Sequence, residues 1–137
     1  MSEFIWPVRV YYEDTDAGGV VYHSNYLNFM ERARTEWLRD LGFDQDRLMA
    51  DGVVFVVGKV SITYIRPLRF NDELEVTVKV IKQGRATLIF QQEIYKKSEP
   101  ETLLSTAEIK VASVDTTRFR PTAIPAALKA EINCANE

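Results

Sequence analysis

The chain has 137 residues, of which 46% are hydrophobic, and this is the size and composition of one domain with an ordinary core. Its formal net charge of −3 argues against nucleic acid as the main partner, because phosphate backbones are bound by concentrated basic surfaces. The single cysteine, Cys134, excludes an intrachain disulfide, which agrees with a reducing compartment.

The N-terminal residues MSEFIWPVRV lack the basic start and apolar run of a signal peptide. No stretch approaches the roughly 18 apolar residues that a membrane-spanning helix needs. Neither an internal repeat nor a low-complexity linker divides the chain. The sequence therefore predicts a single cytoplasmic domain over residues 1–137, without a transmembrane segment.

The first third of the chain predicts a strand, a turn-rich loop and a long helix. Residues 4–11 are typical of a strand, and Pro7 favours an edge position or a strand start. The loop EDTDAGG follows at 13–19. Ser24 or Asn25 can cap the helix start, and Gly42 lies where a helix often ends. One apolar stripe with spacings of three and four comprises Tyr26, Phe29, Met30, Ala33, Trp37, Leu38 and Leu41.

The opposite side of this helix is expected to be polar and exposed. It would present Glu31, Arg32, Arg34, Glu36 and Arg39, with Arg32 and Glu36 forming an ion pair four residues apart.

The rest of the chain predicts a short helix near 44–50 and then four strands, at 53–65, 73–81, 86–96 and 102–114. Apolar residues alternate with polar ones in these strands, as on the two faces of a sheet. The turns are expected at 83–84 and 98–100, and residues 121–133 form a short helix or coil. In the last strand, the apolar residues expected on one face of the sheet are Leu103, Ala107, Ile109 and Val111. The order strand, helix, four strands predicts an α+β fold, with an antiparallel sheet of about five strands around one long helix.

The polar residues before the long helix are the best candidates for chemistry. Asp14, Asp16 and His23 cluster there beside Glu13, with two glycines after Asp16. The first N–H groups of a helix are unpaired and stabilise negative charge, so a nearby carboxylate could work beside an oxyanion site. Ordinary turn chemistry of aspartates explains the same pattern, and a metal site of these three residues matches no known spacing.

Other catalytic and binding motifs are absent from the sequence. It contains no G-x-S-x-G, no G-x-x-x-x-G-K, no G-x-G-x-x-G and no C-x-x-C. Basic residues near strand ends and turns are either solvated charges or a phosphate clamp, and these are Arg66, Arg69, Lys82 and Arg85.

The stretch VRVYYEDTDAGGVVYHSNYLNFMERARTEWLRDL, residues 8–41, closely resembles the Tol–Pal-associated acyl-CoA thioesterases. These belong to the 4-hydroxybenzoyl-CoA thioesterase-like group of hotdog proteins. The core signature, YEDTDAGGVVYHSNYL, is long and specific, and the similarity extends over roughly residues 5–125.

The resemblance implies a hotdog fold and hydrolysis of acyl-CoA to a free acid and CoA, with no cofactor and no metal. It implies Asp16 as nucleophile or general base, and His23 as a residue that positions or polarises the substrate. The oxyanion donor would be a backbone N–H around His23, Ser24 and Asn25. Asp14 would brace the loop.

The same resemblance implies binding of the CoA phosphates by Arg85, helped by Lys82 or Arg69. It also implies a homodimer or homotetramer with active sites at the dimer interface.

Two other functions stay open at this point. A hotdog hydratase or dehydratase would use His23 and Asp16 on a β-hydroxyacyl chain. A non-catalytic module would hold acyl-CoA or acyl carrier protein for a partner. The sequence does not define the acyl chain, nor whether CoA or acyl carrier protein is the donor.

Overall fold

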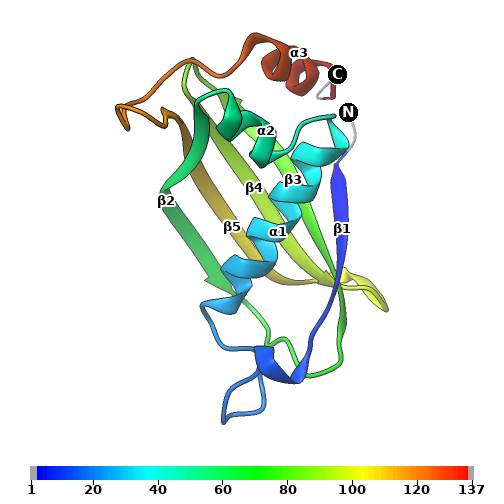
Figure 1. Cartoon of the computed structure of the whole chain (residues 1–137). Coiled ribbons are helices and arrows are strands. Elements are labelled where there is room, and N and C mark those ends of the chain that lie inside the picture. The colour runs from blue at the N-terminus through cyan, green and yellow to red at the C-terminus, as the bar shows by residue number, and fades with distance from the viewer. Residues whose placement is uncertain (1–2, 136–137) are drawn as a thin grey trace.

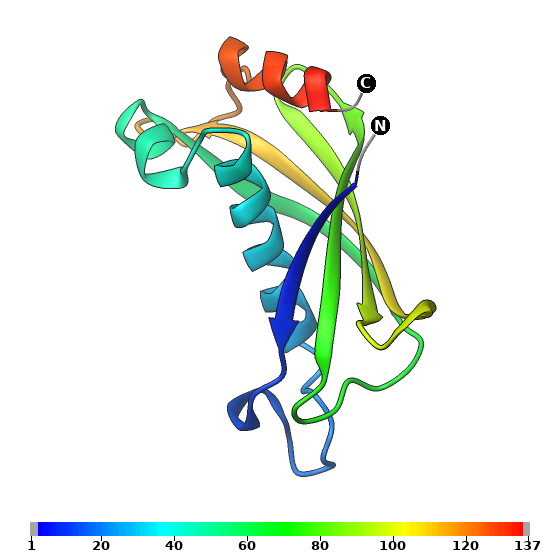
Figure 2. The same ribbon diagram turned by 90° about the vertical axis from the view of Figure 1, so that its right-hand side faces the viewer.

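A computed structural model describes residues 3–135 and shows one curved antiparallel sheet with a long helix on its concave side (Figures 1 and 2). The strand order is β1-β3-β4-β5-β2. The elements are β1 (Phe4–Arg9), η1 (Tyr12–Asp14), α1 (Asn25–Asp40), α2 (Gln45–Ala50), β2 (Val53–Tyr64), β3 (Glu73–Gln83), β4 (Thr87–Lys96), β5 (Glu99–Asp115) and α3 (Ala126–Ala135). This confirms the predicted α+β architecture of five strands around one long helix.

Helix α1 is fixed by its apolar stripe. Phe29, Met30 and Ala33 are fully buried, and Trp37 and Leu38 are nearly so. The helix ends at Asp40 because Gly42 takes a positive φ of 93°, a conformation that residues with a Cβ rarely adopt. The Gly42 N–H then donates to the Arg39 carbonyl oxygen at 3.0 Å.

The sheet buries the face that alternation predicted for β3 and β4. Leu74, Val76, Val78 and Val80 of β3 are all buried, as are Leu88, Phe90 and Ile94 of β4. Position 92 continues this buried row with a glutamine that has no exposed surface. The inner row of β4 is therefore not purely apolar.

Three details of the sequence prediction are wrong. Leu103 does not continue the inner row of β5: the register shifts next to Tyr95, and Leu104 is the buried residue. Arg34 is half-buried rather than exposed, and its Nη1 donates to Gln92 Oε1 at 2.9 Å. Glu36 pairs with Arg39 at 2.6 Å instead of with Arg32.

The first strand lies at an edge of the sheet, one of the two positions that Pro7 favoured in the sequence. Pro7 lies in β1, which is an edge strand.

The C-terminal segment forms α3, which packs Leu128 and Ile132 into the core beside the β3–β4 hairpin (Figure 1). Within residues 3–135, no helix is long and apolar enough to cross a membrane.

Candidate active site

The loop between β1 and α1 is a tight, internally bonded structure at one end of the sheet. The Asp16 N–H donates to the Val20 carbonyl oxygen at 2.9 Å, and the Gly19 N–H donates to the Asp16 carbonyl oxygen at 3.0 Å. Gly19 has a φ of 81°, which this turn requires and which a side chain would strain. The loop therefore presents Asp16 in a defined place.

Asp14 and Asp16 have different surroundings. Asp14 is only 8% exposed, and its Oδ2 accepts from the Tyr11 N–H at 2.8 Å while its Oδ1 accepts from Asn25 Nδ2 at 2.6 Å. Oδ1 thus joins the loop to helix α1, Oδ2 joins it to the segment that follows β1, and the predicted bracing role of Asp14 is confirmed.

Asp16 is exposed, and its Oδ1 accepts from the Gly18 N–H at 2.8 Å. A Cβ on residue 18 would lie 3.2 Å from that oxygen, so a glycine there keeps the carboxylate uncrowded. None of the salt bridges within residues 3–135 involves Asp16. This carboxylate therefore keeps lone pairs available for a substrate.

The turn that leads into α1 leaves two consecutive N–H groups free. The Tyr22 N–H donates to the Asp14 carbonyl oxygen at 3.0 Å, and the Asn25 N–H donates to the Tyr22 carbonyl oxygen at 2.8 Å. Between them, the N–H groups of His23 and Ser24 have no acceptor among residues 3–135. Of the three residues expected at this helix start, Asn25 has no free N–H to offer.

Asp16 and His23 line the same open hollow, of about 370 Å³. Its walls come from the loop, the first turn of α1 and the segment after β2, and comprise Asp16, Val20, Val21, His23, Tyr26, Tyr64, Ile65, Arg66 and Pro67. Burial raises the pKa of Tyr26, so this hydroxyl remains neutral and accepts from the Leu68 N–H at 3.3 Å.

Tyr64 and Arg66 also line this hollow. The sequence indicated Arg66 only as a solvated charge or part of a phosphate clamp, and it did not indicate Tyr64 as a site residue. Which end of β2 lies beside the loop depends on strand order, and the sequence pattern does not define strand order.

The basic residues expected to bind CoA are divided between the two ends of the sheet. Arg69 is paired through its backbone with Val20 and so lies next to the Asp16 loop. The Arg9–Glu73 pairing puts the start of β3 at this end, so Lys82 and Arg85 lie at the far end, near α3 (Figure 1). Within one chain, Lys82 and Arg85 are not brought together with Asp16.

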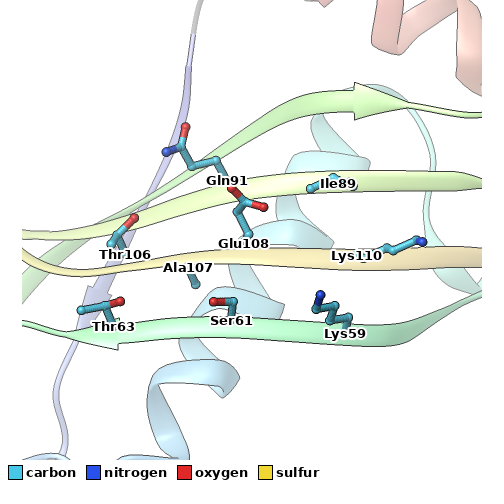
Figure 3. A pocket seen from close by; sticks show the side chains of 9 residues that line it. All are labelled: Lys59, Ser61, Thr63, Ile89, Gln91, Thr106, Ala107, Glu108 and Lys110. Carbon is cyan, nitrogen blue, oxygen red and sulfur yellow. The ribbon is translucent and has the colours of Figure 1, made fainter.

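A second hollow, of about 550 Å³, lies on the sheet face that points away from α1 (Figure 3). Lys59 of β2 and Lys110 of β5 are direct cross-strand partners on it, and Glu108 is nearby. It contains none of the candidate catalytic residues. No cluster of three or more His, Cys, Asp or Glu side chains suited to a metal occurs within residues 3–135.

The hollow therefore brings the accessible carboxylate of Asp16 together with His23, whose N–H and that of the adjacent Ser24 have no acceptor within residues 3–135. A carboxylate can attack an activated carbonyl or deprotonate water, and N–H donors stabilise the oxyanion that forms. This combination suits acyl transfer from an activated acyl group.

Comparison with known proteins agrees with this chemistry. Residues 10–132 match the family described as the thioesterase-like superfamily. The chain is 48% identical to the acyl-CoA thioester hydrolase YbgC of Escherichia coli over 128 residues, which cover 93% of this chain and 94% of that protein. It is 46% identical to the acyl-CoA thioesterase YbgC of Haemophilus influenzae, over 93% of this chain and 92% of that protein.

A solved structure gives the fold independently. The 1,4-dihydroxy-2-naphthoyl-CoA thioesterase from Synechocystis superposes with a TM-score of 0.91, covering 99% of both chains at 20% identity. At that identity the likeness concerns the fold alone, and the fold is the predicted hotdog. The chain belongs to the thioesterase-like superfamily of hotdog proteins.

Proposed function

We propose that this protein hydrolyses acyl-CoA thioesters to a free acid and CoA, with Asp16 as the catalytic carboxylate. The observation that carries the proposal is the shared hollow, which the exposed carboxylate of Asp16 lines together with His23, at the turn whose N–H groups are free. The names of the YbgC relatives support acyl-CoA as the substrate class.

The chemistry needs few groups because a thioester carbonyl is already electrophilic and a thiolate leaves readily. In one route, Asp16 attacks the carbonyl carbon, the oxyanion is held by the N–H groups of His23 and Ser24, and the C–S bond breaks to release CoA thiolate. Water then hydrolyses the mixed anhydride. In the other route, Asp16 takes a proton from a water molecule that attacks directly. We favour the first route, because Asp16 is the only carboxylate among the residues that line this hollow.

His23 would contribute by position rather than by proton transfer alone. Its ring lies against Tyr22, at 4.6 Å between centroids, and edge-on to Tyr64 at 6.4 Å. These rings hold the imidazole at the wall of the hollow, where it can orient the acyl group or polarise the carbonyl.

A second subunit would complete the site. Strand β2 is an edge strand, and alternation places Val60 and Tyr64 on the face opposite Lys59, Ser61 and Thr63, toward α1. Val60 is 37% exposed and Tyr64 is 43% exposed, so this inner row is uncovered in one chain. We propose a homodimer that pairs through β2, alone or as half of a homotetramer.

Such a dimer would also account for the divided basic residues. Antiparallel pairing of β2 with its copy would bring the far end of one sheet toward the Asp16 end of the other. Arg85 and Lys82 would then bind CoA phosphates across the interface, and Arg69 would bind them from the same chain. Arg66, which lines the hollow with Asp16, is an additional candidate.

The direct test is an assay of free thiol with acyl-CoA substrates of increasing chain length, run beside hydration of crotonyl-CoA. We expect CoA release that depends on acyl length, without hydration. Hydration without thiol release would favour a hydratase or dehydratase, and tight binding without turnover would favour a carrier module. Either result would overturn the proposal.

Four further features stay predictions from the sequence: association with the Tol–Pal system, acyl carrier protein as donor or partner, a cytoplasmic location, and a single domain over 1–137. Comparing an acyl-CoA with the same acyl chain on acyl carrier protein would decide the donor.

A further inference from the structure

Tyr64 makes a hydrogen bond to the turn that carries the free N–H groups, and the mechanism above does not use it. Its hydroxyl donates to the carbonyl oxygen of His23 at 3.0 Å. Tyr64 is the last residue of β2, so this bond joins the end of an edge strand to the turn that precedes α1 (Figure 1). The two partners lie 41 positions apart in the sequence.

The Tyr64 side chain is itself held in place by aromatic contacts. Its ring lies edge-on to the buried Tyr26, with 4.8 Å between centroids and 83° between planes. Tyr26 in turn accepts from the Leu68 N–H just after β2. The hydroxyl of Tyr64 is therefore presented to His23 by a packed support and not by a free side chain.

The accepting carbonyl belongs to the same peptide unit as the N–H of Ser24. The structure has no cis peptide bonds among the described residues, and in a planar trans peptide the C=O and N–H point in opposite directions. Fixing the His23 carbonyl therefore fixes the direction of the Ser24 N–H. A donor on the carbonyl oxygen also polarises the amide, which makes its N–H a stronger donor.

The neighbouring peptide is held in an equivalent way. The Tyr22 carbonyl accepts from the Asn25 N–H at 2.8 Å, and that carbonyl shares its peptide with the His23 N–H. Both candidate oxyanion donors thus belong to peptides whose carbonyls are engaged. The donor to the Tyr22 carbonyl is the Asn25 N–H of the same turn, whereas the donor to the His23 carbonyl is the hydroxyl of Tyr64, which is distant in sequence.

We infer that Tyr64 is a positioning residue for the oxyanion site, aligning and polarising the Ser24 N–H through the His23 carbonyl. This inference rests on the proposed function, since it assigns a role within that site. Tyr64 acts through another group and needs no contact with the substrate.

The test compares Tyr64→Phe with the wild-type protein in the free-thiol assay. The substitution keeps the ring against Tyr26 and removes only the hydroxyl. We expect kcat to fall by about 10-fold, less than the 10²–10³ for loss of a whole oxyanion donor, with KM changed less than about 2-fold. The melting temperature should stay within a few degrees, and the backbone ¹⁵N resonance of Ser24 should move upfield as the peptide loses its polarising bond.

Tyr95→Phe is a matched control, because it also removes one tyrosine hydroxyl that is hydrogen-bonded, here to Glu93 Oε1 at 2.9 Å. Burial and this bond raise the pKa of Tyr95 to about 12, so the group is neutral under assay conditions. Tyr95 does not line the hollow, and its loss should leave kcat and the Ser24 resonance unchanged.

Asp16→Asn, measured in the same series, separates failure of the inference from failure of the proposed function. If Asp16→Asn loses activity while Tyr64→Phe keeps the wild-type kcat and Ser24 resonance, the role of Tyr64 is disproved and the function stands. If the wild-type protein releases no CoA, the proposed function fails, and an unmoved Ser24 resonance would disprove the peptide alignment independently. A change confined to KM would contradict a role in stabilising the oxyanion.

Discussion

At the scale of single residues, the least expected feature is a polar network between α1 and the sheet. Gln92 has no exposed surface, and its Nε2 donates to the carbonyl oxygens of Met30, at 3.0 Å, and Thr77, at 3.2 Å. Its Oε1 accepts from Arg34, whose guanidinium also lies 5.9 Å from the centre of the Phe90 ring. Burial lowers the pKa of Arg34, and nearby Glu31 opposes this effect. The sequence placed Arg34 on the exposed side, because a buried acceptor on a strand distant in sequence leaves no trace in the helical periodicity.

Replacing the buried glutamine should be costly. Gln92→Met keeps the volume but leaves the half-buried Arg34 without its acceptor, and hydrogen bonds to charged groups contribute about 1.5–3 kcal/mol. We expect the free energy of unfolding in urea to fall by about 2–3 kcal/mol. Gln91→Met, one residue away on the outer face, should change it by less than about 0.5 kcal/mol. Equal losses for the two variants would show that the network contributes no stability.

At the scale of elements, the sequence predicted all five strands and the two helices that precede β2, because hydrophobic periodicity and glycine positions are local signals. The place of the candidate site was also a local signal, since Asp16, His23 and Ser24 lie within nine residues of sequence, but the choice of Asp16 rested on the family resemblance. Register shifts were not predictable. Gly58 interrupts the β2–β5 ladder between Val57 and Lys59, and Leu104 replaces Leu103 in the core. Such bulges depend on the partner strand, which periodicity within one strand does not contain.

The role of Gly42 in ending helix α1 can be tested by substitution. Gly42→Ala places a Cβ on a residue with a φ of 93°, so we expect a loss of about 1 kcal/mol in the free energy of unfolding. Gly42→Asn should cost less, because asparagine tolerates positive φ better than alanine does. The two variants can be compared by urea denaturation followed by far-UV circular dichroism. An alanine variant as stable as the wild type would show that Gly42 does not limit the helix.

At the scale of the whole molecule, the sheet curves around α1 (Figure 2) and ends at β2, the outer strand on the left of Figure 1, whose inner residues Val60 and Tyr64 are partly exposed. The exposed inner residues of β2 and the open hollow at Asp16 lie at this edge. In the proposed dimer, one chain would supply the candidate catalytic groups, whereas the wall of the acyl pocket and part of the CoA site would come from the second. The sequence could not place Arg85 relative to Asp16, because in the proposed dimer that relation would depend on how the two chains pair.

Light scattering at micromolar concentration should give at least twice the mass of one chain. Val60→Glu puts a charge on the inner row of β2, which one chain tolerates because the position is 37% exposed, but which a second chain would bury. This variant should dissociate and lose activity while remaining folded. Ser61→Glu, on the opposite face of the same strand, should keep at least the dimer. An active wild-type monomer would contradict the shared site.

The central claim is that Asp16 carries the chemistry, and the steady-state rate of Asp16→Asn with acyl-CoA tests it most directly. The change keeps the size of the side chain and removes the charge, the nucleophile and the base together. We predict a fall in kcat of roughly 10²–10⁴-fold, with folding and acyl-CoA binding largely kept. Asp14→Asn is the matched control and should cost more stability and less activity, because both Asp14 oxygens brace the loop. Turnover by Asp16→Asn at a near-normal rate would contradict the assignment of Asp16.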